Sequence, residues 1–179
     1  MKRISFKWST LAILGLAVFG CEKDKNGGPD NEQELITTVA LKFVGGGQTL
    51  TFTAEDKDGD GGKAPIIQPI ALKANTDYSL SVAFSDASKT PAIDITTEVK
   101  TESNDHLVCF ENTGAMNAPL QQDKDAAGKT LGLESTLKTG AIGTGTLKVT
   151  LKHMPSKSSA NACATGETDA EATFNVTVQ

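Results

Sequence analysis

Apolar and polar residues alternate with a period of two along most of the chain after residue 34. Successive side chains of a β-strand point to opposite faces, so this pattern predicts strands that bury one face. The clearest case has its apolar residues at Tyr78, Leu80, Val82 and Phe84. Further predicted strands cover residues 37–43, 50–54, 93–99, 106–110, 131–137, 147–153 and 174–178.

The segments between these strands are typical of turns. Gly45-Gly46-Gly47 separates the first two strands and predicts a hairpin. Gly, Asn, Asp and Pro recur between the later strands, and no segment keeps a helical period. The sequence therefore predicts an all-β domain over residues 35–179, an immunoglobulin-like β-sandwich of about seven to nine antiparallel strands.

The first twenty residues have the composition of a signal peptide. They hold Lys2, Arg3 and Lys7 and no acidic residue, and then the apolar run 11–19. That run is too short for a permanent membrane-spanning helix, which needs about 20 residues. Residues 18–21, Val-Phe-Gly-Cys, resemble the lipobox of bacterial lipoproteins, although Phe19 is larger than the residue usual there. We expect cleavage after residue 20 and acylation of Cys21.

Residues 21–34 are expected to link the acylated cysteine to the domain. They contain no large apolar residue and cannot build a core, so they predict a flexible tether. The lysine-rich and acidic start at 22–25 resembles the signals that send Bacteroidota lipoproteins to the cell surface. We therefore expect an outer-membrane lipoprotein that faces the periplasm or the cell exterior, with the membrane as its first partner.

Charge argues against nucleic acid as a partner. Loss of residues 1–20 removes three basic residues and no acidic one, which leaves 14 lysines against 22 acidic residues and a net charge of −8. Arg3 is the only arginine of the chain, so the mature protein has no guanidinium group for bidentate phosphate binding. We expect no nucleic-acid binding.

Two cysteines remain once Cys21 is acylated. Cys109 and Cys163 form an even pair in an exported protein, where thiols are oxidised. The sequence favours a disulfide between them, and the alternative is two unpaired thiols.

The segment Asp56-Lys57-Asp58-Gly59-Asp60-Gly61-Gly62 is a candidate Ca²⁺ site. Carboxylates at alternate positions, Asp56, Asp58 and Asp60, resemble the start of an EF-hand loop. The twelfth position is Ile67 rather than glutamate and the flanks are predicted strands, which excludes an EF-hand. Calcium would need a carboxylate from another loop, and the alternative is a solvated acidic turn.

The two histidines are candidate ligand-binding residues. His153 continues the inward register of the strand at 147–153, and His106 opens the strand at 106–110. If the two strands were neighbours, the imidazoles could share a metal or bind a ligand. The alternative is a hydrogen-bonded structural role.

No catalytic motif is present in the sequence, neither a nucleophile elbow nor a metalloprotease helix nor a phosphate loop. A glycan site usually offers Trp or Tyr faces. Trp8 leaves with the signal peptide, and Tyr78 falls in core register. We expect a non-enzymatic binding domain for a small ligand, a glycan or a protein partner. The alternatives are a calcium-stabilised structural or assembly accessory and a hydrolase without a recognisable motif.

Five segments together resemble small Bacteroidota envelope lipoproteins of unknown function: residues 34–39, 58–65, 72–78, 151–155 and 166–169. Some members carry the label of a type 1 periplasmic binding fold. That fold is a large two-lobed α/β structure, which the short and β-alternating chain does not match. The resemblance implies an envelope location and a β architecture, and it implies no activity and no catalytic residues.

Overall fold

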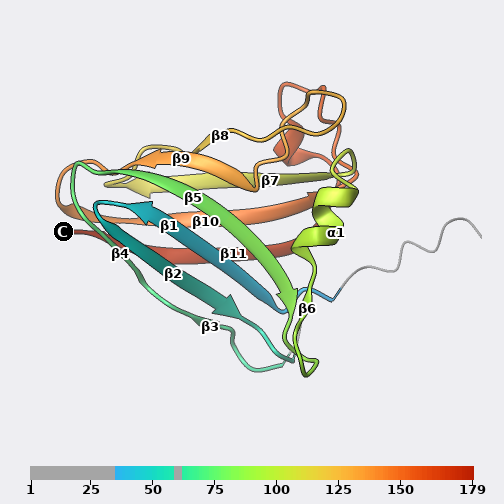
Figure 1. Ribbon diagram of the computed structural model, residues 1–179, viewed down its shortest axis with the longest axis horizontal. Helices are drawn as coiled ribbons and strands as arrows, with labels where there is room; N and C mark the ends of the chain where they lie inside the picture. Colours follow the sequence, from blue (N-terminus) through green and yellow to red (C-terminus); the bar gives the residue numbers. More distant parts are fainter. Residues whose placement is uncertain (1–34, 59–61) are drawn as a thin grey trace, which may run out of the picture. The chain divides into compact units, whose positions relative to one another are not determined.

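The structure, a computed structural model, describes residues 35–58 and 62–179. The described residues form two sheets that enclose one core (Figure 1). The signal peptide, Cys21, the tether and Asp60 lie outside the described residues, so the expectations about them stay predictions.

The larger sheet has the strand order β3-β2-β1-β5-β9-β8, with β6 paired to β5. Its register pairs Leu41 of β1 with Phe52 on one side and with Val82 on the other. Gly46 and Gly47 turn β1 into β2 with positive φ angles of 56° and 76°, which glycine adopts without strain. The strands are β1 Thr38–Gly45, β2 Gln48–Glu55, β3 Ile66–Ile67, β5 Asp77–Asp86, β6 Ile93–Asp94, β8 Leu120–Gln121 and β9 Glu134–Lys138.

The smaller sheet has the strand order β4-β11-β10-β7. β10 lies in its centre and pairs antiparallel with β11 on one side and with β7 on the other, whereas β4 runs parallel to β11. The strands are β4 Ile70–Leu72, β7 His106–Gly114, β10 Gly143–His153 and β11 Glu167–Val178. A 3₁₀ turn, η1, covers Ala162–Ala164.

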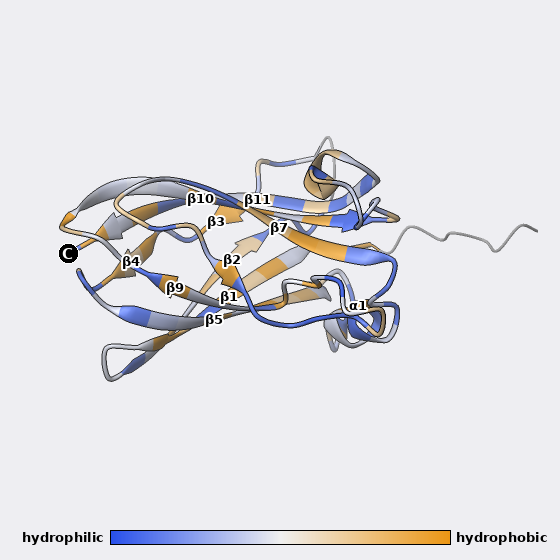
Figure 2. Ribbon diagram, turned by 90° about the horizontal axis from the view of Figure 1, so that it is seen from above, coloured by the Kyte–Doolittle hydropathy of each residue, from blue (hydrophilic) through white to orange (hydrophobic). Residues whose placement is uncertain are grey.

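The core lies between the two sheets. Viewed edge-on, β10 and β11 lie in one layer and β1 and β5 in the other (Figure 2). Alternate residues of the long strands β1, β5 and β10 are buried there, as the period of two predicts: Val39, Leu41 and Phe43 from β1, Tyr78, Leu80, Val82 and Phe84 from β5, and Leu147, Val149 and Leu151 from β10. Phe43 also meets Phe52 and Tyr78 edge to face, with ring centroids 6.0 and 6.1 Å apart.

These sheets confirm the predicted all-β sandwich. The described residues contain eleven strands rather than seven to nine, because β3, β4, β6 and β8 are only two or three residues long. Strands of two or three residues carry too little alternation to be recognised as separate strands in a sequence. The parallel pairing of β4 with β11 also departs from the expected antiparallel order.

The predicted strand at 93–99 is wrong. Ile93 and Asp94 form β6, and the chain then enters the helix α1, Thr96–Thr101. The carboxylate of Asp94 accepts hydrogen bonds from the Thr96 N–H (2.9 Å) and the Thr97 hydroxyl (2.7 Å) at the start of this helix. Ile95 and Val99, four positions apart, are both buried on the side that meets the core. Within the described ranges, no helix is long and apolar enough to cross a membrane.

The segment 131–133, expected as part of a strand, instead crosses between the sheets. The Leu131 carbonyl accepts a hydrogen bond from Val108 of β7 (2.7 Å), and the Leu133 carbonyl accepts one from Val82 of β5 (2.9 Å). Gly132, with a φ of 92°, lies between them. Backbone bonds to both layers therefore fix the start of β9.

The loop between β10 and β11 is attached to the rest of the domain at two points. Cys163 forms a disulfide with Cys109 of β7, with Cα atoms 5.9 Å apart. Lys157 donates hydrogen bonds to the carboxylate of Asp125 (2.9 Å) and to the Ser103 carbonyl (2.6 Å). Both charged side chains are buried, at 8% and 1% exposure. The loop that connects residues 153 and 167 is therefore held by covalent and ionic links.

Replacement of both Cys109 and Cys163 by serine should lower the free energy of unfolding. The bridge closes a loop across a sequence separation of 54 residues, and the chain-entropy model gives about 4 kcal/mol for a loop of that length. Urea unfolding of the wild type and the double variant measures the difference. Reduction of the wild type should reproduce the loss, and equal stability of the oxidised wild type and the variant would contradict the expectation.

Replacement of Lys157 by methionine should destabilise the domain by about 3 kcal/mol, because it leaves the Asp125 carboxylate buried without its cation. Burial by itself raises the pKa of Asp125, but hydrogen bonds from Lys157 and from the Lys129 and Ala127 N–H groups outweigh it and lower the pKa below its ordinary value. Ionised Asp125 therefore stabilises the fold at any pH above the ordinary pKa of aspartate. This contribution is lost as the pH falls through the lowered pKa of the folded state.

Urea unfolding at pH 7 and at about pH 2.5 measures both effects. The gap between the wild type and the Lys157→Met variant should narrow in acid. Lys42→Met, at an exposed position of β1, is the matched control and should change stability by less than about 0.5 kcal/mol. A Lys157→Met effect no larger than that of the control would show that the pair contributes nothing.

Candidate functional site

The two histidines lie side by side at one end of the smaller sheet. His106 is the first residue of β7 and His153 the last of β10, and the register pairs them directly. Their rings are stacked, with centroids 4.9 Å apart and planes inclined by 16°. The condition set by the sequence, that the two strands be neighbours, is met.

A β-bulge adds Asp169 to this pair. Leu151 of β10 pairs with Ala170 of β11, and Lys152 pairs with Thr168, so the residue between them, Asp169, has no partner in the ladder. Strict alternation would turn Thr168 inward and Asp169 outward. Instead Thr168 accepts a hydrogen bond from the Lys152 ammonium (2.9 Å), and the Asp169 carboxylate lies beside the histidines. Bulges often redirect a side chain in this way near functional sites.

The loop that joins His153 at the end of β10 to the bulge in β11 depends on Gly166. Its φ is 74°, and a Cβ at this position would lie 2.3 Å from the His153 carbonyl oxygen and within 3 Å of Pro155. Only glycine allows so close an approach. The chain can therefore return from the end of β10 directly into the bulge.

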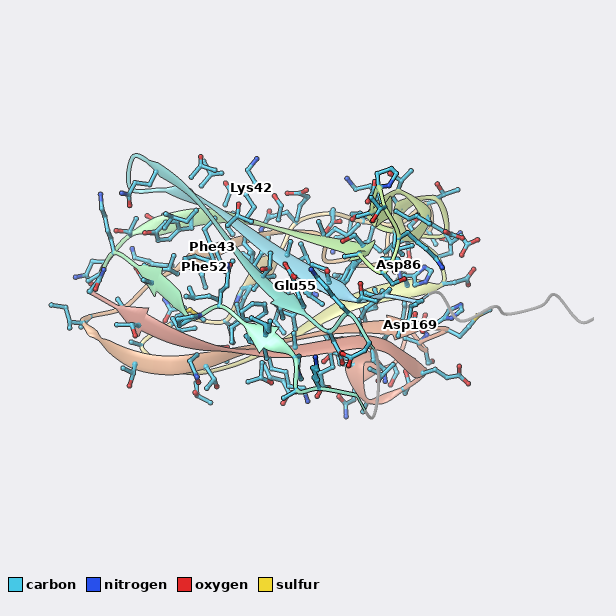
Figure 3. All side chains as sticks on the ribbon, turned by 90° about the horizontal axis from the view of Figure 1, so that it is seen from below. Lys42, Phe43, Phe52, Glu55, Asp86 and Asp169 are labelled. Atoms are coloured by element: carbon cyan, nitrogen blue, oxygen red, sulfur yellow. A yellow bond between two sulfur atoms is a disulfide. The ribbon has the colours of Figure 1, made fainter. Side chains whose placement is uncertain are left out.

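The carboxylate of Asp169 lies near both imidazoles. Its Oδ2 lies 3.7 Å from Nε2 of His106, and its Oδ1 lies 3.8 Å from Nδ1 of His153. The three side chains are 7%, 4% and 13% exposed, respectively. Oδ1 is buried and accepts no hydrogen bond from the described residues. Asp169 lies toward the same end of the two sheets as Asp86 (Figure 3).

Hydrogen bonding orients one of the rings. Nδ1 of His106 lies 3.1 Å from the carbonyl oxygen of Glu102, the residue that follows α1. A carbonyl can only accept, so Nδ1 carries a proton and Nε2 faces Asp169. Burial raises the pKa of Asp169 above its ordinary value, and the charges that His153 and His106 acquire on protonation counteract this shift.

Within the described residues, these three side chains are the one group of His, Cys, Asp and Glu whose ligand atoms lie close enough together to hold a metal ion. The three ligand atoms lie within 4.8 Å of one another. Two chemical states fit such a cluster: an imidazolium paired with a carboxylate, or a shared metal cation.

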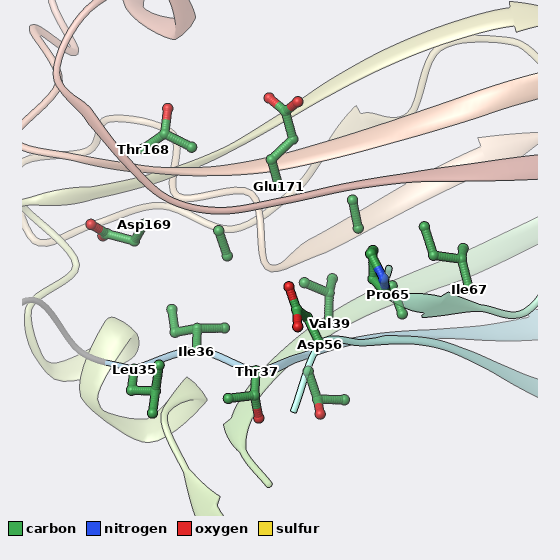
Figure 4. A pocket seen from close by; sticks show the side chains of 14 residues that line it. Leu35, Ile36, Thr37, Val39, Asp56, Pro65, Ile67, Thr168, Asp169 and Glu171 are labelled. Atoms are coloured by element: carbon green, nitrogen blue, oxygen red, sulfur yellow. The ribbon is translucent and has the colours of Figure 1, made fainter. Parts of the chain in front are cut away.

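A cavity adjoins the cluster, between β11 and the strands β1 and β2. Its volume is about 680 Å³, within the range usual for small-molecule sites. Thr37, Asp56 and Ile67 lie on the side of the larger sheet, and Asp169 and Glu171 belong to β11 (Figure 4). The remaining described lining residues are Leu35, Ile36, Thr38, Val39, Ala54, Pro65, Thr168, Ala170 and Ala172.

The charge of this lining is negative. Its described residues include Asp56, Asp169 and Glu171 and no lysine, arginine or histidine. Outside the lining, Lys148 of β10 lies 3.0 Å from Glu171 and balances that carboxylate in part. The cavity therefore combines aliphatic surface with an excess of carboxylate.

The candidate Ca²⁺ loop is described only in part, because Asp60 lies outside the described residues. The Asp58 carboxylate accepts a hydrogen bond from the Lys63 N–H (2.9 Å) and so closes the turn. The Asp56 N–H donates to the Thr37 carbonyl (2.8 Å), and Asp56 also lines the cavity. Calcium binding by Asp56, Asp58 and Asp60 stays a prediction.

Sequence reasoning missed Asp169 as a partner of the histidines. The residue lies just before the alternating run that ends the chain, and strict alternation from Phe174 assigns it to the outer face. The feature of the sequence that could have pointed to Asp169 is Gly166 followed by the polar run Glu167-Thr168-Asp169, which departs from the apolar alternation. A departure of this kind indicates an irregular strand start but not the direction of a side chain.

Comparisons with known proteins give no assignment: no family model matches the chain, and no curated protein or solved structure shows significant similarity to it.

Proposed function

We propose that this chain is an envelope lipoprotein, anchored through acylated Cys21, and that its β-sandwich is a non-enzymatic binding domain. The ligand occupies the cavity between β11 and the strands β1 and β2. It is a small molecule with an aliphatic part and a cationic group. The resemblance to small Bacteroidota lipoproteins belongs to the same proposal and supports the envelope location.

The anchor is supported by the order of features at the start of the chain. A basic segment, a nine-residue apolar run and the Val-Phe-Gly-Cys sequence precede a polar stretch without large apolar residues. Acyl chains on Cys21 would contribute about 0.8 kcal/mol for each methylene buried in a leaflet, which is enough for stable attachment when several chains are present.

The cavity is the observation that carries the binding function. Aliphatic side chains such as Ile36 and Val39 offer an apolar surface for the body of a ligand. The described lining holds three carboxylates, those of Asp56, Asp169 and Glu171, and no cationic side chain, which favours a cation over an anion in the same space. The mature chain contains no tryptophan, so stacking on an indole face plays no part in this recognition.

Replacement of Cys21 by alanine should abolish acylation and release the protein from the membrane fraction. Metabolic labelling with an alkyne-bearing palmitate, followed by membrane fractionation, measures both effects in the native host. Cys163→Ala is the matched control and should keep the label. A labelled Cys21→Ala variant, or an unlabelled wild type in the cytosol, would refute the anchor.

Binding in the cavity can be followed through a single introduced tryptophan. The buried apolar cluster formed by the described residues draws on both sheets, and a chain of residues 22–179 keeps all of it without the acylated cysteine. In an Ile67→Trp variant, hexyltrimethylammonium should change the tryptophan emission in a saturable way, whereas hexyl sulfate should not, because the lining is acidic.

Ile142→Trp is the control for this experiment, since Ile142 is 78% exposed and does not line the cavity. Its emission should not respond to either probe. The same response in both variants would mean non-specific association. No response of the Ile67→Trp variant to the cationic probe would refute the proposed ligand class.

A further inference from the structure

We propose that His106, His153 and Asp169 bind a divalent transition-metal ion, with Zn²⁺ as the best fit. The ligands are Nε2 of His106, Nδ1 of His153 and the carboxylate of Asp169. This inference goes beyond the proposed binding function and does not depend on which molecule occupies the cavity.

The distances within the cluster fit a shared ion better than direct contact. The two imidazole nitrogens lie 3.7 and 3.8 Å from the nearest oxygen of Asp169, and both separations are too long for a hydrogen bond. Two ligands on a tetrahedral zinc ion, each about 2.1 Å from the metal, lie about 3.4 Å apart. A contraction of a few tenths of an ångström would close each nitrogen–oxygen pair around the metal.

The histidine rings must rotate to complete the site. The rings are stacked with planes inclined by only 16°, and nitrogens of two nearly parallel rings do not point at one ion. The ligand atoms spread over as much as 4.8 Å, whereas two ligands on one zinc ion lie at most about 4.2 Å apart. Rotation of His153, the more exposed ring at the end of β10, would bring its Nδ1 toward the carboxylate.

The hydrogen bond of His106 matches the support that metal-binding histidines usually receive. Its Nδ1–H donates to the backbone carbonyl of Glu102, which leaves Nε2 as the coordinating atom. In neutral imidazole this nitrogen carries a lone pair, and it faces a carboxylate oxygen 3.7 Å away. The two groups repel each other, and a cation between them removes the repulsion.

Asp169 provides an independent observation that points to a ligand. Its side chain is more than nine-tenths buried, and its Oδ1 accepts no hydrogen bond from any described residue. A buried polar atom without a partner costs about 1–3 kcal/mol. The bulge directs this side chain to the histidines, and a metal ion would satisfy the free oxygen.

The ligand set selects the class of metal. Two imidazoles and one carboxylate suit zinc and the neighbouring late transition metals, whereas Ca²⁺ requires six to eight oxygen ligands. Three protein ligands also leave a coordination position for water. Asp169 lines the cavity as well. With the metal bound, its charge is neutralised, and a cationic group in the cavity would lie beside Asp56 and Glu171 instead.

The test uses the full-length acylated protein, purified in a neutral detergent without a histidine tag and freed of metal with a chelator. Calorimetric titration with Zn²⁺ should give one ion per chain and a higher melting temperature that EDTA reverses. The His153→Gln and Asp169→Asn variants should each bind about 100-fold more weakly. Asp58→Asn, a control in the acidic turn, should bind like the wild type.

Nuclear magnetic resonance of the unsubstituted protein supplies a second measurement, which does not depend on whether the variants fold. The chain contains only two histidines, and one equivalent of Zn²⁺ should shift the ring signals of both. Absence of stoichiometric Zn²⁺ binding, binding that survives His153→Gln and Asp169→Asn, or unshifted histidine signals would overturn the proposal. In those cases the cluster is an imidazolium–carboxylate pair that serves the fold alone.

Discussion

The register of β10 with its two neighbours is the constraint on which the candidate site depends. β10 pairs with β7 over nine residues and with β11 over eleven. A shift of one residue in either ladder would turn every side chain of the moved strand to the opposite face. The buried residues Leu147, Val149 and Leu151 resist such a shift, so the apolar core also determines that His153 lies opposite His106.

The loop between β10 and β11 and the strand ends that flank it contribute different contacts. The disulfide and the Lys157–Asp125 pair hold the loop. On the face toward the core, the ends of the same two strands present His153 and Asp169. The links that hold the loop are thus made by other residues than the polar cluster.

The sequence predicted the long strands well because each buries a continuous row of apolar residues. Val39, Leu41 and Phe43 illustrate this in β1, and the alternation alone was enough to recognise them. The sequence prediction was wrong at residues 93–99, where hydrogen bonds rather than apolar alternation determine the secondary structure. Ile95 and Val99 fit a strand and a helical turn equally well in the sequence, and the hydrogen bonds of Asp94 decide for the helix.

At the candidate site, too, the sequence pattern predicted one part and not the other. Register and inward direction made His153 a candidate from the sequence, and the pairing with His106 required only that β7 and β10 be neighbours. Asp169 could not be predicted, because a one-residue bulge reverses the direction of its side chain. The bulge lies directly after the loop in which Gly166 approaches the His153 carbonyl closely, and alternation along the sequence does not show such a loop.

Leu35, the first described residue, lines the cavity. With the anchor proposed at Cys21, at most 14 peptide units separate the lipid from this residue, a contour length of about 50 Å at full extension. Under this proposal the domain would stay within about that distance of the bilayer. Molecules released from or travelling along the membrane surface would reach it sooner than molecules in the bulk, which suits an amphiphilic cation.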